Sequence, residues 1–152
     1  MKEMLSKVIA FDMQTGRAPI EDAKPLKRNL STLKMIFSDQ DVAEEILEKD
    51  DPLVYEFYDL HMPEKEGDLA FGSSIVYPGK VGKEYYMTKG HFHTILDTAE
   101  VYYCLNGHGM MMMESPEGNV EYQEMRPGQA VYVPGRYAHR SINLSNTETL
   151  VT

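Results

Sequence analysis

Three histidines and one glutamate in the second half of the sequence have the residue types and the spacing of a metal site. His91 and His93 stand two residues apart, and on a β-strand two such residues project from the same face. Glu100 begins the next apolar run, and an antiparallel hairpin through residues 94–99 is expected to return it beside the two imidazoles. His139 supplies a third imidazole from a later candidate strand. Three neutral imidazoles and one carboxylate suit Fe(II), Mn, Ni or Zn better than Mg or Ca, which prefer oxygen ligands.

A His-x-His pair alone is more often incidental than a metal site, so the interpretation depends on the secondary-structure elements that position the pair. From residue 53 onward, short runs rich in β-branched and aromatic residues are separated at regular intervals by Gly, Pro and Asn. This many short strands indicate a sandwich or a barrel, and the fold class is therefore mainly β. The pattern predicts strands over residues 53–60, 70–77, 85–88, 99–105, 110–114, 120–124, 130–133, 137–144 and 149–152.

The first part of the chain has a helical pattern instead. Ser38 is expected to cap a helix that runs to about Lys49, with Asp41 as its capping-box partner. A shorter helical turn is expected over residues 30–37. No linker rich in Gly, Ser or Pro divides the sequence. We therefore expect the short helices to belong to an N-terminal layer that is added to the strands.

The length of 152 residues suits one domain with a sizeable core. We expect a single domain over residues 1–152, in which an N-terminal extension of residues 1–50 packs on a barrel formed by residues 51–152.

Composition excludes several classes of protein. The chain has 24 Asp and Glu against 15 Lys and Arg, a net charge of −9, which argues against partners such as nucleic acid or an anionic membrane. The single cysteine, Cys104, cannot form an intramolecular disulfide, as is typical of a reducing compartment. The apolar run at residues 8–11 is too short for a signal peptide. We therefore expect a cytoplasmic protein.

The residues around the histidines resemble the two motifs of the cupin superfamily. The first motif is a Gly-flanked His-x-His followed by Glu, six residues and Gly, which Glu100 and Gly107 match. Two departures narrow the family: six residues separate His93 from Glu100 where three or four are usual, and Arg136 replaces a glycine that is common after the motif proline. The second motif is matched by Gly128, Pro134, His139 and Asn143.

The longer spacing, together with the runs at residues 77–84 and 88–93, resembles the archaeal-type, metal-dependent cupin phosphoglucose isomerases. This resemblance covers nearly the whole chain. It implies a cupin jelly-roll β-barrel, usually a homodimer, that interconverts glucose 6-phosphate and fructose 6-phosphate in glycolysis and gluconeogenesis. One divalent transition metal per subunit is implied, with Fe(II) as the expected ion and Mn, Ni or Zn as alternatives. The resemblance places the metal ligands on His91, His93, Glu100 and His139, and the sugar-phosphate contacts on Tyr55, Ser74, Thr88, Gly90 and Tyr102.

Members of this family generally continue for a few tens of residues beyond the position that matches Thr152, and that tail brings a tyrosine toward the substrate. The barrel is accordingly expected to lack the family's C-terminal tail.

A phosphorylated substrate requires a local positive charge in an acidic protein. Cations gather in residues 78–90 and 125–144, but each of them alone is more often a solvated surface charge than a phosphate contact. The cations in these two stretches are Lys80, Lys83, Lys89, Arg126, Arg136 and Arg140.

Several mechanisms and functions stay open from the sequence. Glu100 is the candidate for moving a proton between C2 and C1 of the sugar, and hydride transfer between the two carbons is the alternative route. A cupin Fe(II) oxygenase would use a similar ligand set but would consume oxygen. A non-catalytic cupin that binds sugar phosphate would keep its ligand affinity when Glu100 is replaced by Gln.

Overall fold

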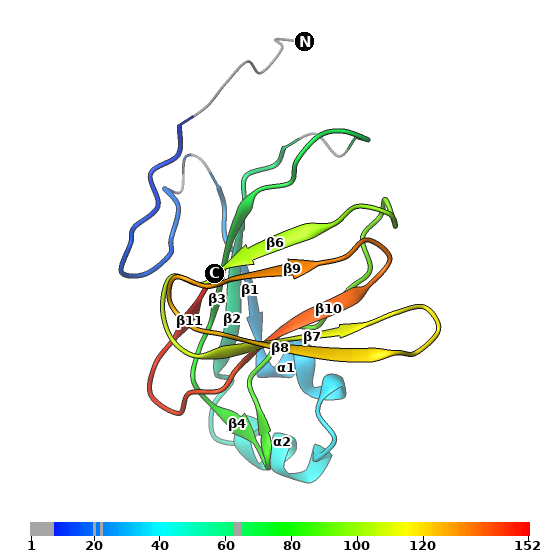
Figure 1. The fold of residues 1–152 in the computed structure, drawn as a ribbon. Helices are drawn as coiled ribbons and strands as arrows, with labels where there is room; N and C mark the ends of the chain where they lie inside the picture. The colour runs from blue at the N-terminus through cyan, green and yellow to red at the C-terminus, as the bar shows by residue number, and fades with distance from the viewer. Residues whose placement is uncertain (1–7, 20, 22, 63–64) are drawn as a thin grey trace.

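The computed structural model describes residues 8–19, 21, 23–62 and 65–152, and most of its regular structure is β (Figure 1). The mainly β class predicted from the sequence is confirmed. The strands are β1 (Leu26–Asn29), β2 (Leu53–Asp59), β3 (Gly72–Val76), β4 (Lys80–Val81), β5 (Glu84–Tyr85), β6 (Glu100–Tyr103), β7 (Gly109–Glu114), β8 (Val120–Met125), β9 (Ala130–Val133), β10 (Ala138–Asn143) and β11 (Leu150–Val151).

The first sheet contains the strands β1-β2-β3-β11 in that order, and its neighbouring strands are antiparallel. It continues into the antiparallel pair β6-β9 through a bridge between Asn106 and Val151. At this bridge the Leu105 amide donates to the Val151 carbonyl at 2.8 Å, and the Val151 amide donates to the Asn106 carbonyl at 3.0 Å. The end of β6 is therefore joined to the edge of β11.

The second sheet contains the antiparallel strands β10-β7-β8. Residues 87–91 extend it on the free side of β10, through bridges from Met87 to Ile142 and from His91 to His139. The Thr88 amide also donates to the Ser141 carbonyl at 2.9 Å. This short segment is the neighbour of β10, and it delivers the first of the candidate ligands.

From β3 onward the chain crosses between the two sheets, passing through residues 87–91, β6, the β7–β8 hairpin, β9, β10 and β11 in turn. Two facing antiparallel sheets with such crossings form the jelly roll that the sequence predicted. Side chains of both sheets meet in one buried core between them. That core includes Tyr55, Val76, Met111, Met113, Val131, Val133 and Leu150.

Each predicted strand contains observed ladder pairing, with one difference in arrangement. Residues 85–88 do not form one strand, because Glu84 and Tyr85 pair with β4 whereas Met87 bridges to β10. The sequence did not predict β1, because its residues Leu26–Asn29 include no β-branched or aromatic side chain. It is placed by pairing with β2 instead.

Two short α-helices and a 3-10 helix follow β1, and they lie together at one end of the sheets in Figure 1. The helix predicted after residue 38 is present, but Asp39 caps it rather than Ser38, since the Asp39 carboxylate accepts from the Val42 amide at 3.1 Å. The Ser38 amide instead donates to Glu84 at 2.7 Å. The helices are α1 (Leu30–Leu33), η1 (Lys34–Ile36) and α2 (Gln40–Leu47).

The described part of the N-terminal segment covers the outer face of β2 and β3. Its Ala18 and Ala23 pack with Tyr58 and Ile75 in a second apolar cluster. The remaining residues of the predicted extension, 1–7, 20 and 22, lie outside the described residues.

An ion pair anchors the same segment to the sheet. Arg17 Nε donates to Glu56 Oε1 at 2.8 Å, and Arg17 Nη2 donates to the Tyr77 hydroxyl at 3.0 Å. The Ser73 hydroxyl also donates to the Gly16 carbonyl. Within the described ranges, no helix is long and apolar enough to cross a membrane.

Candidate metal centre

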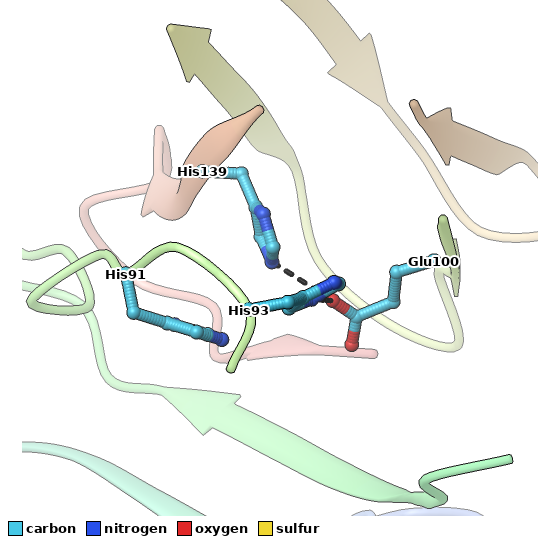
Figure 2. Close-up of side chains that lie close together, drawn as sticks. All are labelled: His91, His93, Glu100 and His139. Carbon is cyan, nitrogen blue, oxygen red and sulfur yellow. Dashed lines mark hydrogen bonds and ion pairs between the residues drawn. The ribbon is translucent and has the colours of Figure 1, made fainter. Parts of the chain in front are cut away.

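The four side chains that the sequence singled out come together at one end of the inner space between the sheets (Figure 2). His91, His93, Glu100 and His139 each offer one ligand atom, and these atoms all lie within 4.8 Å of one another. In Figure 2 the three imidazoles and the carboxylate point toward a common centre.

Backbone pairing holds His91 and His139 side by side. The His91 amide donates to the His139 carbonyl at 3.3 Å, and the His139 amide donates to the His91 carbonyl at 3.2 Å. Residues directly opposite in an antiparallel pair project to the same side, so the two rings lie with their centroids 4.9 Å apart. Two of the candidate ligands are therefore fixed relative to each other by main-chain hydrogen bonds.

The expected hairpin between His93 and Glu100 is wrong. His93 lies outside the strands, and Glu100 pairs across with Val133 of β9. A loop over residues 94–99 joins them, with a turn in which the Thr98 amide donates to the Ile95 carbonyl at 3.0 Å. Glu100 thus reaches the histidines from the opposite sheet, because β6 begins where the two sheets face each other.

Backbone carbonyls orient two of the rings. The Nδ1 atom of His93 lies 2.7 Å from the Thr98 carbonyl, and Nδ1 of His139 lies 3.2 Å from the Tyr137 carbonyl. A carbonyl only accepts, so in each neutral ring the proton belongs on Nδ1 and the lone pair on Nε2. That tautomer is the one in which Nε2 can bind a metal. The sequence could not indicate these partners, because any residue type supplies a carbonyl.

The carboxylate position tests whether a cation fits. Glu100 Oε2 lies 2.9 Å from Nε2 of His93 and 2.8 Å from Nε2 of His139. If both Nε2 atoms carry lone pairs, three electron-rich atoms face one another and require a positive charge between them. Nε2 of His139 is buried and, among the described residues, makes no well-aligned hydrogen bond. A metal ion bound by three nitrogens and one oxygen would satisfy all of these atoms.

The charges in the cluster affect one another. Burial raises the pKa of Glu100, but hydrogen bonds donated by His139 and His93, and the positive charge that these rings carry when protonated, outweigh it, so this pKa lies below its usual value. Desolvation of its ring and the neighbouring His139 lower the pKa of His91, although Glu100 opposes the shift. Both directions favour an ionised carboxylate beside a neutral imidazole, which are the ligand forms that a metal requires.

Three of the residues expected to bind substrate lie beside the cluster. The ring of Tyr102 has its centroid 5.7 Å from that of His139, and burial, followed by the charge of Glu100, raises its pKa. Tyr102 therefore stays protonated and can donate a hydrogen bond. Thr88 pairs with β10 through its side chain, since its Oγ1 accepts from the Ser141 amide at 3.0 Å.

Gly90 is the third of these residues, and its position requires glycine. Its φ is +80°, and a Cβ there would lie 3.3 Å from the His139 carbonyl oxygen. Glycine therefore lets the main chain before His91 pass close to β10.

The other two expected contacts, Tyr55 and Ser74, lie at buried positions of β2 and β3. Tyr55 is opposite Val76, and Ser74 is opposite Phe57, so all four share the inner face of the first sheet. Tyr55 and Ser74 thus face the inner space from the sheet that also carries Glu100 and Tyr102.

The cations that the sequence singled out do not gather on this inner face. Arg140 is opposite Met112 in the β10–β7 ladder and alternates with the inward His139, so it projects outward. Arg140 and Lys89 line a cavity of about 210 Å³ whose wall also includes Gly90, His91 and His139.

Comparison with known proteins shows that most of the chain is similar to one protein family. Residues 27–152 match the sequence profile of the family described as glucose-6-phosphate isomerase. Proteins named glucose-6-phosphate isomerase are similar to this chain over about nine tenths of its length. One from Thermococcus kodakarensis is 50% identical over 136 residues, which cover 90% of this chain and 70% of that protein. One from Thermococcus litoralis is 48% identical over 135 residues, covering 89% and 70%.

A more distant bacterial protein of the same name, from Sinorhizobium medicae, is 36% identical over 141 residues, covering 92% of this chain and 65% of that protein. Among solved structures, a deletion variant of oxalate decarboxylase from Bacillus subtilis superposes with a TM-score of 0.50 at 20% identity, covering 69% of this chain and 27% of that one. At that level of identity the structural similarity concerns the fold alone.

Proposed function

The chain belongs to the archaeal-type cupin family of glucose-6-phosphate isomerases, and we propose that it isomerises its sugar phosphate with the help of a divalent transition metal. Members of this family are aldose–ketose isomerases. Metal dependence is our proposal, and one observation carries it: four ligand atoms of His91, His93, Glu100 and His139 lie within 4.8 Å of one another. We propose these four residues as the metal ligands.

A bound ion would supply a Lewis acid that polarises the adjacent oxygens at C1 and C2 of the sugar. Glu100 is then the group that moves a proton between C2 and C1. Its ionised carboxylate is the form that accepts a proton. The alternative route, in which a hydride passes directly between the carbons, leaves Glu100 only as a ligand.

We assign the sugar-phosphate contacts to residues around the inner space. Tyr102 offers a protonated hydroxyl beside His139. Thr88 and the amide of Gly90 come just before His91, on the segment that pairs with β10. Tyr55 and Ser74 offer hydroxyls from the facing sheet. A substrate held between them would lie between the two sheets, with its reacting carbons beside the four candidate ligands.

The remaining features of the function are proposals of the same kind. Fe(II) is the expected ion and Mn, Ni or Zn are alternatives, because three imidazoles and a carboxylate suit each of them. We propose a homodimer in the cytoplasm that acts in glycolysis and gluconeogenesis. Residues 1–152 are proposed to form one cupin domain, in which residues 1–50 extend a barrel of residues 51–152.

The direct test is an assay of glucose 6-phosphate isomerisation on metal-depleted protein, before and after Fe(II), Mn, Ni or Zn is added. We expect activity to disappear on depletion and to return with at least one of these ions, equally well with and without oxygen. Full activity in protein shown by elemental analysis to hold no metal would refute metal dependence. Oxygen consumption with turnover would indicate an oxygenase instead.

A further inference from the structure

Strand β1 carries one basic side chain on each side of the first sheet. The β1–β2 register sets Arg28 opposite Tyr55, and Lys27 opposite Glu56. Directly opposite residues project to the same side of a sheet. Tyr55 belongs to the core between the sheets, whereas Lys27 Nζ lies 3.9 Å from Glu56 Oε2 on the outer side, where Arg17 also binds. Arg28 therefore lies on the inner side with Tyr55.

Arg28 is an unusual residue for that side. At the other inner ladder positions of the described chain, the two facing sheets carry apolar, hydroxyl, amide, imidazole or carboxylate groups. Arg28 is half-buried, and among the described residues no carboxylate oxygen lies within 4.0 Å of its guanidinium. A guanidinium partly removed from water without a counter-charge is unfavourable. An anionic ligand would supply that charge.

The neighbours of Arg28 indicate which anion. The hydroxyl-bearing Tyr55 stands directly opposite Arg28. A second hydroxyl on the same face, that of Ser74, lies two strands away on β3, in the next inner row, opposite Phe57. A phosphate monoester has three oxygens, which can accept from a guanidinium fork and from hydroxyls at the same time. We propose that Arg28 binds the phosphate group of the substrate and so selects phosphorylated sugars, an assignment that rests on the proposed function.

The other cations near the site do not compete for this role. Arg140 is opposite Met112, on the outer face of the second sheet, and Lys89 is exposed, although both line a cavity that also reaches His91 and His139. Arg17 is already paired with Glu56 at 2.8 Å. In the described chain, Arg28 thus combines an inner position, a permanent charge and no carboxylate partner.

The kinetic test compares Arg28→Met with Lys27→Met, its neighbour on the other side of the same strand. Loss of a charge-assisted contact is expected to raise KM for glucose 6-phosphate by about 10- to 100-fold in Arg28→Met while kcat stays within about threefold. Lys27→Met should keep both constants. Simple destabilisation lowers the amount of active enzyme and hence the apparent kcat, without raising KM. A KM within twofold of the unmodified value would overturn the assignment.

A binding test separates this inference from the isomerase assignment. Calorimetry with inorganic phosphate should show binding to the unmodified protein and to Lys27→Met, and at least about tenfold weaker binding to Arg28→Met. Equal phosphate affinity in all three proteins overturns the role of Arg28 alone. Binding that depends on Arg28 in a protein without isomerase activity overturns the proposed function alone.

Arg28→Lys protects the test against a folding defect. This variant keeps the charge but loses the planar fork, so we expect a phosphate affinity between those of the unmodified protein and Arg28→Met. Circular dichroism identifies which variants are folded. If Arg28→Met is unfolded, Arg28→Lys is compared with Lys27→Met, and an unchanged phosphate affinity in Arg28→Lys together with an unchanged KM overturns the proposal.

Discussion

Two glutamates of this protein stand in charged clusters that belong to one sheet but differ in their partners. Glu56 on β2 faces the N-terminal segment, with 1% of its side chain exposed, and it pairs with Arg17 at 2.8 Å. Glu100 on β6 faces the inner space, with 36% of its side chain exposed, and its close partners are His93 and His139. The first carboxylate has a permanent cation, whereas the second has groups that are neutral in their ligand form.

This difference separates a structural cluster from a chemical one. A buried carboxylate with a guanidinium partner has its charge balanced by the fold itself. The fold does not balance the charge of a carboxylate that lies between imidazole lone pairs. Only a proton or a bound cation can balance it. Glu100 can therefore accept a proton or a bound cation, whereas Arg17 already balances the charge of Glu56.

The substitution expected to have the largest effect is Glu100→Gln. Amide replacement removes the proton-accepting carboxylate, and general acid–base groups contribute about 10²- to 10⁴-fold to rate. We therefore expect kcat for glucose 6-phosphate to fall by about that factor while three imidazoles still bind metal. A coupled assay and elemental analysis measure the two quantities. The matched variant Glu56→Gln should stay active, and substantial turnover in Glu100→Gln would remove the catalytic role from Glu100.

Arg17→Met should have the next largest effect, on stability rather than on rate. It leaves Glu56 buried without its close partner, and breaking one side of a buried pair costs about 3–5 kcal/mol. Because Arg17 is itself half exposed, with 50% of its side chain accessible, the lower end of that range is expected. Denaturant unfolding measures the change. A loss of kcat without a loss of stability would contradict the structural role.

The double variant Arg17→Met with Glu56→Gln should be affected less than Arg17→Met alone. Removing the carboxylate charge together with its partner avoids an unpaired buried ion, so much of the lost stability should return. Chemical unfolding of the two single variants and the double variant gives the coupling energy between the residues. Strictly additive effects would show that the two side chains do not interact.

The smallest effect is expected at an exposed pair. Lys34 Nζ lies 2.6 Å from Glu44 Oε1, and 60% of the Glu44 side chain is accessible. Water screens such a pair, so Lys34→Met should leave the thermal midpoint unchanged within error. A clear drop in the midpoint would mean that short distance, rather than burial, decides what an ion pair contributes in this protein.

The sequence predicted the four converging side chains better than it predicted the way they converge. Residue types and motif spacing were enough to single out His91, His93, Glu100 and His139. The expected hairpin was wrong because spacing along the chain says nothing about which strand is the partner. Glu100 pairs with Val133 and His91 with His139, and both pairings join segments that are distant in the sequence.

Residues with weak local signals were missed. β1 has no strand-like composition and forms because β2 offers it an edge, so the inner position of Arg28 could not be predicted. The helix cap was placed one residue early, since Ser38 and Asp39 are both good capping residues and only the geometry distinguishes them. The carbonyls of Thr98 and Tyr137 belong to the main chain, which carries no sequence signature.

Because the bridge between His91 and His139 forms only in the folded chain, metal binding at the candidate site would be coupled to the folding equilibrium. In an unfolded chain these two residues are far apart, and the complete set of four ligands exists only when both sheets have formed and crossed. An ion that requires all four ligands therefore binds only folded molecules. At a free concentration 100 times its Kd, such an ion would add about 2.7 kcal/mol to the free energy of unfolding by mass action. The same cation would serve the reaction and select the folded state.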